Sequence, residues 1–222
     1  MPDLGGWDVR AERTGPEWID FHLYVADDWQ CTETGYVSDI HLWGSYKDDY
    51  WLPIRKIYVG IHDHLGSPFP GPLLWQRDFV EGDFMIIPYG TGLQGWYDPS
   101  DGTMVENDHH KFHQINITDI DDPFIQEKDH LYWLAIAVET FYPYEPHWGW
   151  KTSCSWDWYG EFPVYEDPYI WGQWYPIFQS GPVGDMAFVI TGEPVVPEPT
   201  TMLLLGAGLI GLAGFRKKLW QR

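Results

Sequence analysis

Short alternations of apolar and polar residues, separated by clusters of Gly, Pro and Asp, follow one another from residue 18 to residue 192. The segment from residue 55 to residue 62 is the clearest, because Ile57, Val59 and Ile61 occupy every second position. A period of two is typical of a β-strand, whose successive side chains point to opposite faces of a sheet. These residues show no helical periodicity longer than a turn or two, so the pattern predicts an all-β domain.

Seven further segments carry strand-like patterns: residues 19–26, 39–45, 84–89, 111–118, 131–139, 169–178 and 185–192. The segment 131–139 is apolar on both faces, which is typical of a central strand that is covered on both sides. The 18 Pro and 23 Gly of the chain supply turns between such short strands. This spacing predicts a single β-sandwich of jelly-roll type over residues 1–192.

The C-terminal end of the chain has a different composition. Residues 193–199 form a Pro-rich linker, and residues 200–215 carry no charged side chain. A basic cluster follows at once, Arg216, Lys217 and Lys218. The apolar run is shorter than the ~20 residues of a typical membrane-spanning helix, but the basic cluster is what a cytoplasmic end requires. We therefore predict a transmembrane helix at 200–215 and a basic cytoplasmic end at 216–222. The alternative, a buried C-terminal helix of the domain, fits neither the Pro-rich lead nor the basic end.

Within the linker, Pro197, Glu198 and Pro199 form a Pro-Glu-Pro motif ahead of the apolar run and the basic end. These three features, in this order, resemble the PEP-CTERM sorting signal of exosortase-processed bacterial proteins. The resemblance implies export across the inner membrane, temporary anchoring there by the C-terminal helix, and recognition by the exosortase, a membrane-embedded cysteine transpeptidase. It also implies a final location at the surface or in the extracellular matrix of a bacterium.

The stretches SDIHLWGS, IHDHLGSPFPGPLLW, GTGLQGWYDP, YWLAIAV, GWKTS and DMAFVITG occur in this order between about Gly5 and Gly192. Together they resemble a group of uncharacterised exported bacterial domains that often precede PEP-CTERM tails. The resemblance implies no known activity. The first residues, MPDLGGWDVR, contain neither the basic n-region nor the apolar h-region of a signal peptide. Because a sorting signal acts only on an exported chain, we expect the start of this sequence to be truncated.

Acidic residues dominate the charge of the chain. There are 33 acidic against 13 basic residues, a formal net charge of −20, and four of the basic residues lie in the last seven positions. Such a surface repels nucleic acid and anionic lipid headgroups, so we exclude nucleic-acid binding. It favours divalent cations, and Asp119, Asp121 and Asp122 of the turn TDIDDP are candidate calcium ligands. The turn lacks a full calcium-loop signature, and the alternative is that each Asp bonds only its own backbone.

The whole chain contains 15 Trp and 14 Tyr, and the region from Pro143 to Trp174 is especially rich in both. The candidate glycan ligands in this region are Trp148, Trp150, Trp156, Trp158, Tyr159, Trp171 and Trp174. Aromatic planes stack on the apolar faces of sugar rings, and carboxylates accept hydrogen bonds from sugar hydroxyls. Alternatively, these rings fill the core or hold long loops against the sandwich.

Two histidine clusters have the residue types of a zinc site but not its geometry. His62 and His64 flank Asp63 where a predicted strand ends, so strand geometry need not continue into the following loop. In a strand, His109 and His113 share one face and the histidine between them points to the other, so three ligands do not converge. No zinc site is predicted.

Catalytic signatures are missing from the sequence, which has no GxSxG elbow, no HExxH and no Gly-rich phosphate loop. Cys31 and Cys154 lack a metal-binding spacing, and in an exported protein they either form one disulfide or stay free. We therefore expect an exported, non-catalytic protein, sorted by an exosortase, whose domain binds extracellular polysaccharide. No cofactor other than calcium is expected. The alternatives are a purely structural or interaction module of the envelope and, less favoured, a polysaccharide lyase or hydrolase.

Overall fold

The computed structural model describes residues 1–14, 21–141, 147–154, 161–177 and 184–194. The regular elements in this part of the chain are β-strands and one short 3₁₀ helix. They are β1 (Trp7–Arg10), β2 (Glu12–Thr14), β3 (Phe21–Leu23), β4 (Val25–Gln30), β5 (Gly35–Tyr36), β6 (Asp39–Tyr46), η1 (Lys47–Asp49), β7 (Ile54–Asp63), β8 (Leu73–Val80), β9 (Phe84–Asp98), β10 (Thr103–Ile117), β11 (Ile125–Gln126), β12 (Leu131–Thr140), β13 (Trp148–Lys151), β14 (Val164–Glu166), β15 (Trp174–Pro176) and β16 (Phe188–Thr191). The all-β prediction is confirmed.

The first sheet is built around β12. This strand pairs antiparallel with β7 on one side and with β4 on the other, and β7 continues to β8. β14 and β15 extend the sheet beyond β4, and β2 and β3 join it near the end of β12. Leu134 and Ile136 of β12 face the main core, whereas Trp133 and Ala135 pack in a smaller cluster on the opposite face. The doubly covered central strand predicted from the apolar segment is confirmed.

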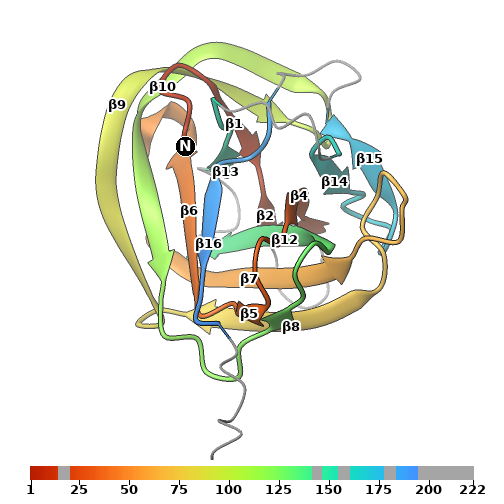
Figure 1. The fold of residues 1–222 in the computed structure, drawn as a ribbon. Helices are drawn as coiled ribbons and strands as arrows, with labels where there is room; N and C mark the ends of the chain where they lie inside the picture. Colours follow the sequence, from red (N-terminus) through yellow and green to blue (C-terminus); the bar gives the residue numbers. More distant parts are fainter. Residues whose placement is uncertain (15–20, 142–146, 155–160, 178–183, 195–222) are drawn as a thin grey trace, which may run out of the picture.

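Five strands of the second sheet close into a ring. β10 pairs with β9 and with β6, β6 pairs with β13, β13 pairs with β1, and β1 pairs in parallel with β9. The long β9–β10 hairpin curves around one side of the molecule (Figure 1). It can bend this far because its pairing shifts register at three places along β10. Gly95 of β9 is also required, since a side chain there would collide with the ring of Trp7 on β1.

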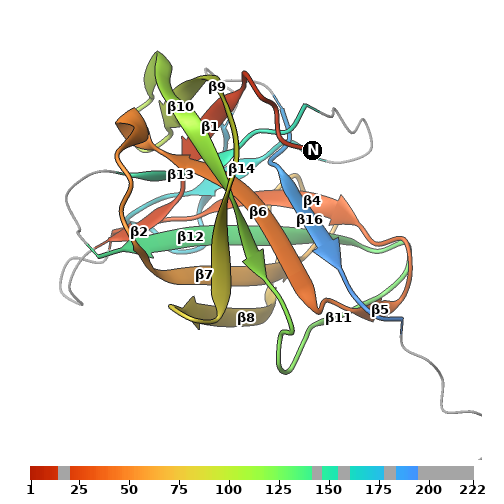
Figure 2. The same ribbon diagram turned by 90° about the vertical axis from the view of Figure 1, so that its left-hand side faces the viewer.

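The main core lies between the two sheets, whose strands cross one another rather than run side by side (Figure 2). Ile57, Val59 and Ile61 of β7 join Ile40 and Leu42 of β6 in this core, and each is at most 2% exposed. Their burial follows from the period of two in the sequence, because β7 turns one face to the core along its whole length.

The two sheets are consistent with the predicted β-sandwich, but their pairing is not purely antiparallel. β1 pairs in parallel with β9, and β2 pairs in parallel with β12. A jelly roll built from Greek keys is antiparallel throughout. The short N-terminal strands therefore depart from the expected jelly-roll order, since each enters a sheet beside a strand that runs in its own direction.

The predicted transmembrane helix at 200–215 and the basic end at 216–222 lie outside the described residues. Within the ranges described above, no helix is long and apolar enough to cross a membrane.

Replacing Ile136 by Ala is expected to lower the free energy of unfolding by about 2–5 kcal/mol, because the deleted atoms leave a cavity in a packed core. Urea unfolding followed by tryptophan fluorescence measures this loss. Leu65→Ala is the control, since Leu65 is 67% exposed and its truncation should cost less than ~0.5 kcal/mol. Equal losses at the two positions would contradict the central place of β12.

Candidate functional site

A groove with a cavity volume of about 240 Å³ lies on the face of the first sheet that points away from the main core. The centre of the groove is hollow because small residues lie opposite one another on neighbouring strands. Gly60 of β7 pairs with Ala135 of β12, and Ala135 pairs in turn with Ala26 of β4. Without long side chains at these positions, the sheet leaves room for a ligand at the centre of this face.

Aromatic rings line the sides of this groove. Tyr24 and Tyr58 meet edge to face, with ring centroids 6.4 Å apart. Trp171 stacks on His22 at 3.4 Å with an interplanar angle of 14°, yet it remains 56% exposed. Trp174 contacts the groove from β15. The groove therefore offers a fixed, partly exposed indole beside two tyrosine rings.

Polar side chains line the same groove. Gln76 and Asp78 reach the groove from β8, and Glu166 reaches it from β14. The Glu166 carboxylate accepts a hydrogen bond from the backbone N–H of Gly172 at 2.5 Å, although burial raises its pKa above the usual range. Burial lowers the pKa of His62, so this imidazole is uncharged at neutral pH. Carboxylates, an amide and a neutral imidazole provide both donors and acceptors for hydroxyl groups.

The structure divides the predicted glycan ligands into three groups. Trp171 and Trp174 lie together in the groove. Trp148 and Trp150 are at most 1% exposed and belong to the main core, where the Trp150 Nε1–H donates to the carbonyl of Ala187 at 2.9 Å. Their assignment as glycan ligands is therefore wrong, because both indoles lie on the face of β13 that points to the main core. Three more lie outside the described residues, namely Trp156, Trp158 and Tyr159.

Tyr24 and Tyr58 were not predicted as ligand-binding residues from the sequence. Neither lies in the aromatic-rich region between Pro143 and Trp174. A usable signal was present, since Gly60 and Ala135 are the small residues at the middle of two strong strand patterns. Small side chains there leave a depression that the flanking tyrosines line.

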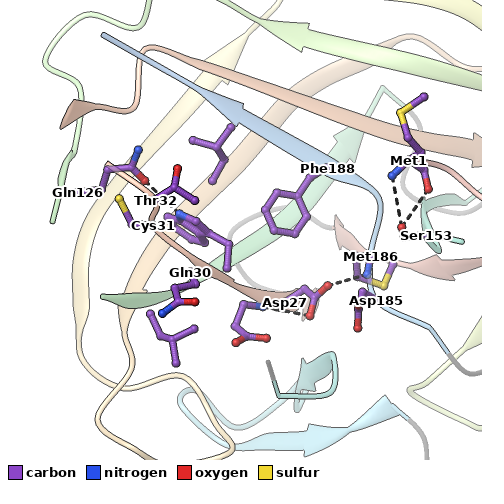
Figure 3. A pocket seen from close by; sticks show the side chains of 14 residues that line it. Met1, Asp27, Gln30, Cys31, Thr32, Gln126, Ser153, Asp185, Met186 and Phe188 are labelled. Atoms are coloured by element: carbon purple, nitrogen blue, oxygen red, sulfur yellow. Dashed lines mark hydrogen bonds between the residues drawn. The ribbon is translucent and has the colours of Figure 1, made fainter. Parts of the chain in front are cut away.

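A second and larger pocket, of about 500 Å³, lies where β4 passes β16 and the chain around Asp185. Figure 3 shows Asp27 and Asp185 near its centre, Phe188 along one side, and Met1 with Ser153 at one end. Asp27 is 2% exposed, and one of its oxygens accepts the Met186 backbone N–H at 2.6 Å. We refer to this pocket, which Asp27, Asp28 and Asp185 line, as the acidic pocket.

Two carboxyl groups of the acidic pocket hold protons unusually tightly. Burial, together with the neighbouring Asp185, raises the pKa of Asp27 well above its usual range. Burial raises the pKa of Asp28 to about 7. One Asp28 oxygen accepts the Glu161 backbone N–H at 3.0 Å, and the other is buried without a hydrogen-bond partner in the described structure. Near neutral pH this carboxyl can therefore both donate and accept a proton.

The predicted calcium ligands do not form a site. The Asp121 carboxylate faces the Arg77 guanidinium at 3.8 Å, and Arg77 also donates to the Asp121 carbonyl. The Asp122 carbonyl accepts the Trp75 indole N–H. Asp119 and Asp122 have positive φ and serve as turn residues. In the ranges that the structure describes, no three His, Cys, Asp or Glu side chains converge to hold a metal ion.

The histidines and cysteines are also dispersed. His62 lines the groove, whereas His64 stacks on Trp133 with ring centroids 6.2 Å apart. His109 is fully buried. Cys31 is a buried free thiol and Cys154 an exposed one, so the disulfide that the sequence left open does not form.

The raised pKa of Asp28 predicts that folding stability depends on pH. The folded protein holds this proton up to about pH 7, whereas the ordinary value for Asp is 3.8. The contribution to stability is therefore full at low pH and is lost as the pH rises from about 4 to 7. Asp28→Asn should remove part of this loss and raise the urea midpoint at neutral pH relative to the unchanged protein. Asp121→Asn, at an exposed carboxylate, should leave the pH profile unchanged; an identical profile for Asp28→Asn would refute the assignment.

Comparison with known sequences assigns both parts of the chain. The family described as Domain of unknown function (DUF7901) matches residues 1–191. The PEP-CTERM protein-sorting motif matches residues 195–218, where the Pro-Glu-Pro motif, the apolar run and the basic residues lie. Such a tail marks an exported protein that is processed by an exosortase at the membrane and sorted to the cell surface or the extracellular space. No curated protein and no solved structure matches the chain. The chain therefore belongs to the DUF7901 family and carries the PEP-CTERM sorting motif of an exosortase substrate.

Proposed function

We propose that this protein is a non-catalytic component of the bacterial surface or matrix that binds extracellular polysaccharide in the groove of the first sheet. The observation that carries the proposal is Trp171. Its exposed indole is fixed by stacking on His22 and lies beside the small residues at the centre of the groove. The polarised C–H bonds on one face of a sugar ring are attracted to the electron-rich face of such a ring. Because Trp171 is already held in place, little conformational entropy is lost on binding.

The size and charge of the groove restrict the ligand. Its volume of about 240 Å³ is below the ~300–1,000 Å³ of sites that enclose a whole small molecule. An open groove of this size suits a short stretch of a longer chain. Asp78 and Glu166 in the groove, and the net charge of −20, disfavour anionic polymers. A neutral or amino-bearing polysaccharide is therefore the expected ligand class.

Trp171→Ala is expected to weaken retention on a bound polysaccharide at least ~10-fold, because a central aromatic anchor contributes more than ~1.4 kcal/mol. Affinity electrophoresis of the purified protein through gels that contain different neutral and acidic polysaccharides measures this loss. Trp51→Ala is a matched control, since Trp51 is 55% exposed and lies outside the groove. Loss of retention in both variants, or in neither, would refute the groove as the binding site. A folded protein that no polysaccharide retains would favour the structural or interaction module instead.

The acidic pocket favours one further function, a hydrolase or lyase acting on polysaccharide. Its support is Asp28, whose pKa of about 7 suits proton transfer at neutral pH. Release of reducing ends or unsaturated products, abolished by Asp28→Asn and unaffected by Asp121→Asn, would establish this activity. Without such turnover the non-catalytic proposal stands.

We further propose that residues 200–215 form a transmembrane helix that anchors the exported chain, with Arg216, Lys217 and Lys218 on the cytoplasmic side, until the exosortase acts at Pro197, Glu198 and Pro199. The proposal rests on the match of residues 195–218 to the sorting motif and on the apolar, uncharged run between motif and basic end.

Glu198→Ala is expected to block processing, because it removes the charged residue of the motif. In a bacterium that carries the cognate exosortase, the variant should remain in the membrane fraction at its unprocessed size on an immunoblot. Glu193→Ala removes a carboxylate just before the motif and should be processed normally. Normal processing of the Glu198 variant would contradict the assigned motif.

A further inference from the structure

Each of the five strands in the closed ring contributes one buried polar side chain to its interior. They are Asp8 of β1, Ser45 of β6, Gln94 of β9, His109 of β10 and Lys151 of β13. All five are at most 1% exposed. Their hydrogen bonds join strands that are not neighbours in the ring, such as β9 with β13 and β1 with β10, so the side chains meet inside it.

Lys151 lies at the centre of this cluster. Its Nζ donates to the side-chain carbonyl oxygen of Gln94 and lies 3.3 Å from a carboxylate oxygen of Asp8. The ring of Phe112 covers it, with the centroid 5.2 Å from Nζ. An amine, an amide carbonyl and a carboxylate are therefore held together in an interior from which water is excluded.

The Gln94 amide is fixed in one orientation. Its Nε2 donates to the backbone carbonyls of Gly92 and His110, both at 3.3 Å. This places the carbonyl oxygen toward Lys151, so that Nζ contacts the oxygen that is bonded to the amide carbon Cδ. Groups held at this range react as if at very high local concentration.

Asp8 is positioned to accept a proton from Lys151. Burial alone raises the pKa of this carboxyl, but Lys151 and His109 outweigh that effect and bring it below its usual range, so Asp8 carries no proton before the reaction. One Asp8 oxygen is shared between Lys151 and His109, and the other is buried without a partner in the described structure. An ion pair that leaves an oxygen unsatisfied contributes poorly to stability in such an interior.

We propose that Lys151 and Gln94 become joined by an intramolecular isopeptide bond inside the ring. The Lys151 ammonium gives one proton to Asp8, and the uncharged amine attacks the Cδ of Gln94. The Nζ–Cδ bond forms and the Cδ–Nε2 bond breaks, while a second proton passes from Nζ to Nε2. The departing ammonia takes up the proton held by Asp8 and leaves as ammonium, so no oxidant, reductant or cofactor is consumed.

The product removes a buried cation. A secondary amide replaces the Lys151 ammonium, and Asp8 keeps His109 as a partner at 2.9 Å. Hydrogen bonding and charge attraction from Asp8 and Asp108 raise the pKa of His109 against the effect of burial, so the remaining pair is charge-matched. The bond would link β9 covalently to β13 across the interior of the ring.

Intact-mass spectrometry of the purified full chain, denatured before measurement, tests the proposal directly. The expected mass is that of the sequence minus one ammonia. Fragmentation should yield a branched peptide that joins the residues around Gln94 to those around Lys151, and trypsin should not cleave after Lys151. The full sequence mass, or the loss of one water that marks a Lys151–Asp8 amide, would overturn the assignment.

Three variants test the chemistry. Lys151→Arg should restore the full mass, because the guanidinium does not attack the amide, and Asp8→Asn should do so because the proton acceptor is lost. Lys111→Arg is the control. Lys111 is an exposed lysine of β10, and its replacement should leave the loss of one ammonia unchanged. An ammonia loss that persists in Lys151→Arg would refute the proposal. The result is independent of glycan binding, since neither residue lines the groove.

Discussion

The pairing of β10 with β6 brings the end of the long hairpin back to the second sheet and closes five strands into a ring. Once the ring is closed, β13 has a fixed place between β1 and β6, and its alternation directs Trp148 and Trp150 to the main core. That core supports one face of β12. The other face is then free to carry the small residues on which the groove depends.

Each candidate site contains residues of β4 or the residue just before it. Tyr24 lines the groove, whereas Asp27 and Asp28 line the acidic pocket. Because β4 pairs with the central strand over most of its length, these side chains are held by one rigid element. Preorganised side chains lose little entropy when a ligand binds, which is an advantage for a groove of small volume.

The sequence predicts the local structure well and the long-range pairing poorly. The period of two around Ile57 and the doubly apolar segment of β12 correctly identify buried strands. Alternation does not show which strand is the neighbour or in which direction it runs, so the parallel β1–β9 pair and the ring were not foreseen. Asp8 and Lys151 resemble ordinary surface charges in the sequence, and their burial could not be predicted without the strand pairing. The same holds for Trp148 and Trp150, two predicted glycan ligands that belong to the core.

The ring also determines how copies of the protein behave when they are crowded together. An open sheet presents unpaired backbone groups at its edges, and these can recruit strands from another molecule. In the described part of the chain, β1, β9, β10, β6 and β13 each pair with a ring neighbour on both sides over part of their length. Free strand edges remain elsewhere in the described residues, among them β8, β3 and β15 of the first sheet and β16 of the second. In a dense layer of such domains, edge-to-edge pairing between copies is therefore expected at these outer strands and not where the ring strands pair with one another.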